Sequence, residues 1–167
     1  MKQLLYVALL GLPMVAHSAD NSPDQSFYKA AAQGGLAEVE QGNLAQEKAQ
    51  SPAVKDFGRM MVHDHSAAND KLKGIASSKG IDLPTSPSTS QKATMGKLKV
   101  LSGDTFDKSY VKGMVKDHKE DIKEFEKEAK IGKDPDAREF AQSTLPTLRA
   151  HLSKIESIAA AAHISTD

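Results

Sequence analysis

The chain contains no cysteine and no tryptophan, and only 5% of its 167 residues are aromatic. Without cysteine it can form no disulfide, no thiolate nucleophile, no cysteine-ligated zinc site and no iron–sulfur cluster. Its charges balance at a formal net charge of zero, so it offers no broad basic surface to nucleic acid or anionic lipid. We therefore expect no nucleic-acid partner, and a core built from aliphatic side chains and alanine.

The first residues have the pattern of a secretory signal peptide. Lys2 is the only charge before Asp20, and an apolar run over residues 4–15 is too short to span a bilayer. Small residues follow, so cleavage is expected after Ser18 or Ala19. We predict a signal peptide at residues 1–19 and a periplasmic mature protein with no stable membrane insertion; an N-terminal membrane anchor is the alternative.

No run of alternating β-branched residues indicates a strand, whereas several signals mark helix ends. A capping residue followed by proline occurs at residues 22–23, 51–52 and 134–135, and Asp104 is a further expected cap. With apolar residues at helical spacing, these signals predict an all-α four-helix bundle. Its domain is expected at residues 22–163, with helices at about 23–50, 52–79, 105–131 and 135–162. A Pro/Ser-rich connection and a short helix join the second and third, which leaves room for a crossover.

The word Met-Val-x-Asp-His occurs twice, as "MVHDH" at residues 61–65 and "MVKDH" at 114–118. His65 lies fourteen residues after Ser51, and His118 lies fourteen residues after Asp104, so both are expected near the middle of their helices. His151 has a similar position in the last helix. On the first helix, Glu40 shares a face with apolar residues, whereas Glu38 is expected in solvent. We predict a central layer of Glu40, His65, His118 and His151.

Residues near these histidines suggest what the layer does. Carboxylates can orient an imidazole through its second ring nitrogen, and thioethers on the same stripe add soft ligands. Imidazole with carboxylate suits iron, manganese or zinc, and imidazole with thioether suits copper. The alternative is a hydrogen-bonded network that only fixes the helix register. The supporting residues in either case are Asp64, Asp117, Asp121, Tyr110, Met61 and Met114.

Four segments in order resemble a known family: "AEVEQGNLAQEKA" (37–49), "VKDFGRMMVHDHSAANDKL" (54–72), "FDKSYVKGMVKDH" (106–118) and "DAREFAQSTLPTLRAHL" (136–152). The chain is similar to the bacterial domain of unknown function numbered 4142. The resemblance implies an exported protein with a ferritin-like four-helix bundle and no established activity. The Glu-x-x-His motif of di-iron carboxylate bundles is absent, so the resemblance does not imply ferroxidase chemistry.

Two functions from different classes follow. The first is an exported metal-binding bundle for metal handling or stress defence. The second is a non-enzymatic envelope protein that pairs with itself or with another envelope protein, with a purely structural histidine network. An oxidoreductase with a dinuclear site is a weaker third candidate, because no nucleophile elbow or phosphate loop indicates catalysis.

Overall fold

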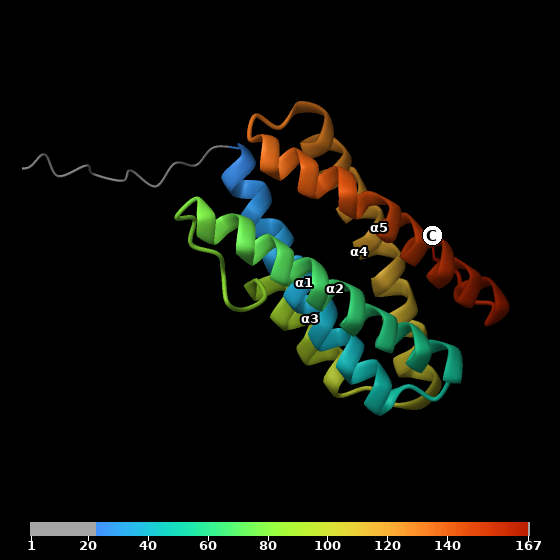
Figure 1. The fold of residues 1–167 in the computed structure, drawn as a ribbon. Helices are drawn as coiled ribbons and strands as arrows, with labels where there is room; N and C mark the ends of the chain where they lie inside the picture. Colours follow the sequence, from blue (N-terminus) through green and yellow to red (C-terminus); the bar gives the residue numbers. More distant parts are fainter. Residues whose placement is uncertain (1–22, 167) are drawn as a thin grey trace, which may run out of the picture.

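The computed structural model describes residues 23–166, which form five helices and no strand (Figure 1). The predicted signal peptide at residues 1–19 lies outside this part of the chain. The four long helices begin and end within two residues of the predicted bounds, and a short helix lies in the long connection. The helices are α1 (Pro23–Lys48), α2 (Pro52–Ser78), α3 (Thr89–Lys99), α4 (Gly103–Ile131) and α5 (Pro135–Ala161).

The long connection between α2 and α4 is a crossover. The helices pack most closely as the antiparallel pairs α1 with α2 and α4 with α5. Because α2 and α4 run in the same direction, residues 79–102 must return along the length of the bundle, and α3 lies in this return, against α1 and α4 (Figure 1). The all-α, ferritin-like bundle predicted from the sequence is confirmed. Within residues 23–166, no helix combines the length and apolarity that a membrane span needs.

The core is divided into two apolar clusters, one on each side of the bundle's middle. One holds Phe57, Met61, Phe106, Tyr110 and Met114, and the other holds aromatic residues such as Phe27, Phe125 and Phe140. On all four long helices, the residues between the clusters include buried polar side chains. The polar layer thus separates two apolar regions that anchor the helices above and below it.

Two glycines bring α1 and α2 into backbone contact. A Cβ atom at Gly42 would lie 2.7 Å from the carbonyl oxygen of Gly58, and a Cβ atom at Gly58 would lie 2.7 Å from that of Gly42. Real Cβ atoms do not approach a carbonyl oxygen so closely, so neither position accepts a side chain without moving a helix. This contact lies one turn from Glu38 and fixes the level of α1 against α2.

The helix starts agree only in part with the predicted caps. Asp134 accepts a hydrogen bond from the backbone N–H of Asp136 at 3.0 Å, as a capping residue does. Ser51 makes no such bond, and the α4 residue Asp107 instead accepts the N–H groups of Gln50 and Ser51, at 3.0 and 2.7 Å. The expectation that Asp104 caps α4 is wrong, because Ser102 precedes the first helical residue, Gly103.

Candidate metal centre

Three histidines from three helices meet in the middle of the bundle. His65 of α2, His118 of α4 and His151 of α5 are all buried, and their ring centroids lie 5.3–5.8 Å apart. His65 lies fourteen residues after Ser51, the residue that precedes its helix, whereas His118 lies sixteen residues after Ser102. The two rings nevertheless contact each other, with centroids 5.8 Å apart. The predicted convergence of His65, His118 and His151 is what the structure contains.

Each ring uses one nitrogen in a contact with an oxygen that accepts. The Nδ1 atom of His118 donates to the backbone carbonyl of Met114, one turn earlier, at 2.9 Å. The Nε2 atom of His151 donates to Oδ2 of Asp64 at 2.8 Å, and Nδ1 of His65 lies 2.9 Å from Oε2 of Glu38. A carbonyl or an ionised carboxylate has no hydrogen to give, so these contacts fix the tautomer of each neutral ring.

The remaining nitrogen of each neutral ring carries a lone pair. These nitrogens are Nε2 of His118, Nδ1 of His151 and Nε2 of His65; the first two are 3.4 Å apart, and Nε2 of His65 is buried without a hydrogen-bond partner. One ligand nitrogen from each ring lies within 4.8 Å of the other two. Among the described residues, these three histidines are the only set of this kind.

The distance between Nε2 of His118 and Nδ1 of His151 is one that a metal ion could span. Two nitrogens about 2.0–2.1 Å from one ion lie roughly 3.3–3.6 Å apart at tetrahedral or trigonal angles, which includes the observed 3.4 Å. A network would need a hydrogen between His118 and His151, and therefore an imidazolium. Burial lowers the pKa of both rings, which works against the imidazolium form.

Glu38 is the charged neighbour of the three rings. Burial opposes ionisation of its carboxyl group, but the imidazoles of His65, His118 and His151 outweigh burial and lower its pKa. Burial likewise lowers the pKa of His65, but the carboxylate of Glu38 reverses the direction and raises it. A proton on Nε2 of His65 would have no acceptor, because that buried atom lacks a hydrogen-bond partner. A cation at this point would take the place of that proton.

The expectation that Glu40 joins the layer is wrong, because Glu40 is exposed and Glu38, expected in solvent, is buried. The mistake arises from treating Leu36 and Val39 as the inward face of the first helix. Both are only partly buried, whereas the small residues Gly35, Gly42 and Ala45 are buried. We call Glu38, His65, His118 and His151 the histidine layer. The stripe of small residues was the sequence signal for it, because close helix packing needs small side chains.

The predicted supporting residues divide into three groups. Asp64 does hold a layer histidine, but the ring is His151 on another helix and not the adjacent His65. Met61 and Met114 are fully buried in the apolar cluster. Tyr110 packs against Phe106, with ring centroids 5.8 Å apart, and its buried hydroxyl has no hydrogen-bond partner.

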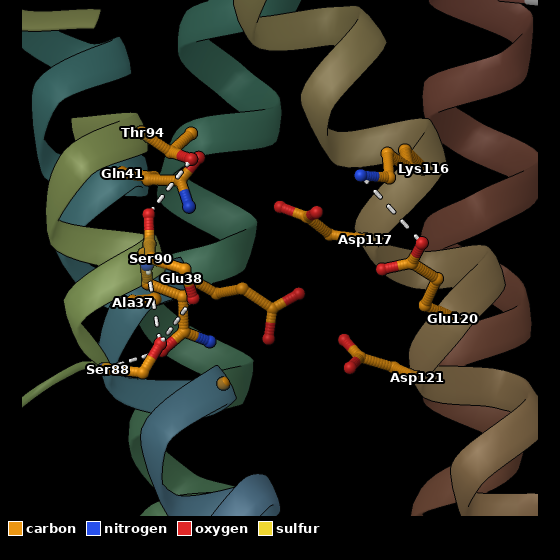
Figure 2. A pocket seen from close by; sticks show the side chains of 12 residues that line it. Ala37, Glu38, Gln41, Ser88, Ser90, Thr94, Lys116, Asp117, Glu120 and Asp121 are labelled. Carbon is orange, nitrogen blue, oxygen red and sulfur yellow. Dashed lines mark hydrogen bonds and ion pairs between the residues drawn. The ribbon is translucent and has the colours of Figure 1, made fainter. Parts of the chain in front are cut away.

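Asp117 and Asp121 make up the third group, and they do not orient His118, whose Nδ1 is taken by its own helix. Both line a pocket beside the layer together with Glu38 (Figure 2). Burial and the nearby charge of Glu38 raise the pKa of Asp117 to about 6. The same two causes raise the pKa of Asp121 well above its usual range. These carboxyl groups are therefore crowded together, and each holds a proton to a higher pH than an isolated aspartate does.

Comparison with known families decides what the chain is related to. The family model described as "Domain of unknown function (DUF4142)" matches residues 12–158. The chain belongs to this family. A comparison with curated proteins finds no match. The resemblance inferred from the four sequence segments is thereby confirmed, and the DUF4142 bundle has the fold described above.

Solved structures share this fold at low sequence identity. A DUF305 protein from Streptomyces coelicolor, predicted to be secreted, is 12% identical with a TM-score of 0.73, over 87% of this chain and 97% of that one. CopM in its Cu(I)-bound form is 14% identical with a TM-score of 0.68, over 81% and 94%. A DUF305 fragment from Deinococcus radiodurans is 12% identical with a TM-score of 0.72, over 81% and 94%. CopM was also solved in Cu(II)-bound and silver-bound forms.

Proposed function

We propose that this DUF4142 protein is an exported bundle that binds one transition-metal ion in its histidine layer, for metal handling or stress defence in the periplasm. The observation that carries the proposal is the convergence of three buried imidazoles, which bring one ligand nitrogen from each ring within 4.8 Å of the other two. The lone pairs on Nε2 of His118 and Nδ1 of His151, 3.4 Å apart, repel in the metal-free protein, and an ion between them removes the repulsion.

The ligand set narrows the class of metal. Three imidazoles suit copper, zinc, iron and nickel, and the carboxylate of Glu38 is near enough to add an oxygen ligand, with Oε1 at 3.5 Å from Nε2 of His118. Copper and zinc match best, because neutral nitrogen donors outnumber carboxylates and divalent affinities peak at copper. CopM, which has the same fold, binds copper and silver, and this supports the proposal without identifying the metal.

The residues around the layer would prepare it for an ion. Met114 and Asp64 fix the tautomers of His118 and His151, and Glu38 holds His65. Such partners of the second ring nitrogen raise the basicity of a ligating imidazole and hold its orientation. The apolar clusters on both sides exclude water from the rings. We expect a rigid site that changes little between its metal-free and metal-bound states.

The test is elemental analysis of the untagged mature protein isolated from the periplasm, followed by titration of the metal-free protein with Cu²⁺ and Zn²⁺. We expect one equivalent per chain, and a stability that rises with metal concentration. The double variant His65→Ala/His118→Ala should bind none, and His118→Gln provides a single change in case the double variant does not fold. His63→Ala is the matched control, because His63 is exposed one residue before Asp64. Equal metal content in all four proteins would refute the proposal.

A further inference from the structure

A pocket of about 270 Å³ opens beside the histidine layer, between α1, the start of α3 and α4 (Figure 2). Serine, threonine and glutamine side chains of the crossover line its outer part. Its inner part is formed by Glu38 from α1 and by Asp117 and Asp121 from α4. The crossover thus forms one wall of the pocket, and the opposite wall includes Glu38 of the histidine layer.

The lining of this acidic pocket carries four carboxylates and one ammonium group. The fourth carboxylate is Glu120, and Nζ of Lys116 lies 3.9 Å from it, near the rim. Lys116 is also near enough to act on Asp117, and Glu38 lies 2.9 Å from Nδ1 of His65. Figure 2 shows Glu38 reaching from α1 toward the space between Asp117 and Asp121. Its Oε1 atom is buried without a hydrogen-bond partner and lies 3.5 Å from Nε2 of His118, so Glu38 extends from the pocket to the rings.

A second and smaller cavity, of about 20 Å³, adjoins this pocket on the side of His65. His65 lines the smaller cavity, and the two cavities share Gly34, Glu38 and Asp121 as lining residues. The volume is close to that of a single water-sized probe, so an ion that has lost most of its water is of the right size. Gly34 has no side chain to narrow the passage, and the nearest atom to a Cβ there would be Oδ1 of Asp121, at 3.9 Å.

The physical obstacle to loading a buried site is the loss of the ion's hydration shell. Carboxylates along the way replace water oxygens one at a time, and a negatively lined cleft raises the local cation concentration and the association rate by about 10–1,000-fold. The carboxylates do not themselves form a resting place, because among residues 23–166 only the histidines bring three ligand atoms together. Their arrangement suits passage of an ion and not its storage.

We propose that the acidic pocket is the route by which a divalent metal ion reaches the histidine layer, with Asp117, Asp121 and Glu38 as successive oxygen ligands along it. This proposal rests on the proposed function, since it needs an ion that binds the imidazoles. On this route, Asp117 and Asp121 affect the rate at which the ion is loaded and not the affinity of the final site. Glu38, which lines both cavities and touches the rings, serves both.

Stopped-flow loading of the metal-free mature protein with Co²⁺, followed by the visible absorption of the bound ion, tests the route. In Asp117→Asn/Asp121→Asn we expect the association rate constant to fall at least tenfold at low ionic strength, with one Co²⁺ still bound per chain. Raising the salt concentration should slow the wild-type protein more than this variant. The control Glu124→Gln/Glu126→Gln removes the same charge from the same helix, outside the lining of the pocket.

A steric variant tests the same route without a change of charge. Gly34→Leu places a side chain in the wall shared by the two cavities, and we expect slow loading with unchanged stoichiometry. Gly74→Leu is its control, because nothing lies within 4 Å of a Cβ atom there.

Wild-type loading rates in Asp117→Asn/Asp121→Asn and Gly34→Leu would overturn the route and leave the metal site standing. If Asp117→Asn/Asp121→Asn bound less than one Co²⁺ per chain, the route would be overturned too, since those residues would then be ligands of the ion in its final site. A wild-type protein that takes up no Co²⁺ refutes the metal site, and the route with it.

Discussion

The two copies of Met-Val-x-Asp-His place their methionines and histidines alike, but their aspartates lie in opposite electrostatic environments. Met61 and Met114 are both fully buried in the same apolar cluster, and His65 and His118 both reach the histidine layer. Their aspartates differ. Asp64 meets an imidazole of α5, and although burial works against ionisation, its contacts with His63 and His151 lower its pKa. Asp117 faces the acidic pocket instead, where burial and Glu38 raise its pKa to about 6.

The difference shows how far a local motif determines its own surroundings. Spacing within the helix places the methionine and the histidine on the inward stripe in both copies. The aspartate lies at the edge of that stripe, so its environment depends on the neighbouring helix. For Asp64 that neighbour supplies an imidazole, and for Asp117 it supplies the carboxylate of Glu38. Four substitutions separate these contributions.

The largest effect is expected for Glu38→Gln, which removes the charge that acts on both copies. Since the folded-state pKa of Glu38 is lowered and that of His65 is raised, their pairing stabilises the fold mainly between about pH 4.3 and pH 6.5. That stability is lost as pH falls through the Glu38 pKa or rises through the His65 pKa. In metal-free protein at pH 6, we expect a loss of about 2–4 kcal/mol in the free energy of unfolding, measured by urea denaturation.

The same variant should change the titration of Asp117. Without the Glu38 charge, its pKa should move down from about 6 toward the ordinary aspartate value, and NMR titration of the side-chain carboxyl measures this shift. Glu40→Gln is the control, because Glu40 is exposed on the same helix. A stability loss in Glu40→Gln as large as in Glu38→Gln would contradict the assignment of Glu38 to the layer.

The second-largest effect is expected on metal affinity, which should fall in the Asp64 variant and not in the Asp117 variant. Asp64→Asn keeps an acceptor oxygen for Nε2 of His151 but removes its charge, so the ring becomes a weaker ligand. We expect the affinity for Zn²⁺ to fall about 10–100-fold, measured by competition with a chromophoric chelator. Asp117→Asn should leave this equilibrium affinity within about twofold of the wild type. Equal losses in both variants would mean that the two copies support the site in the same way.

The third effect is a gain in stability from Asp117→Asn. The folded-state pKa of about 6 exceeds the unfolded value of about 3.9, so the folded protein holds a proton that the unfolded chain releases first. Stability is therefore lost as pH rises from about 4 to about 6, and asparagine avoids that loss. In metal-free protein at pH 7.5 we expect a gain of about 1–2 kcal/mol, since Asp117 is partly exposed, and no gain at pH 4. A loss of stability at pH 7.5 would place Asp117 in a favourable contact and remove it from the acidic pocket.

The sequence was sufficient for the fold and for three of the layer's four residues, for identifiable reasons. Helix-end signals and apolar spacing depend on local geometry, so they predicted the four long helices and the level of His65, His118 and His151. The sequence pattern places Glu38 in solvent because the inward face of α1 consists of small residues, which a hydrophobic pattern does not mark as buried. The partner of Asp64 and the shape of the acidic pocket were out of reach, because both depend on which helices the crossover makes neighbours.

The smallest effect is expected at the position where the two words themselves differ. His63→Lys converts the first copy to the second, and the side chain it changes is 85% exposed. The substitution removes a 2.7 Å contact between Nδ1 of His63 and Oδ1 of Asp64, while Oδ2 of Asp64 remains on His151. Exposed pairs of this kind contribute about 0–1 kcal/mol, and an exposed lysine beside Asp64 supplies a compensating charge. We expect stability within about 0.5 kcal/mol and Zn²⁺ affinity within twofold of the wild type, measured by the same denaturation and competition assays. A large loss of affinity would mean that His63 itself binds the ion, and the site would then lie at the surface of α2 and not in the buried layer.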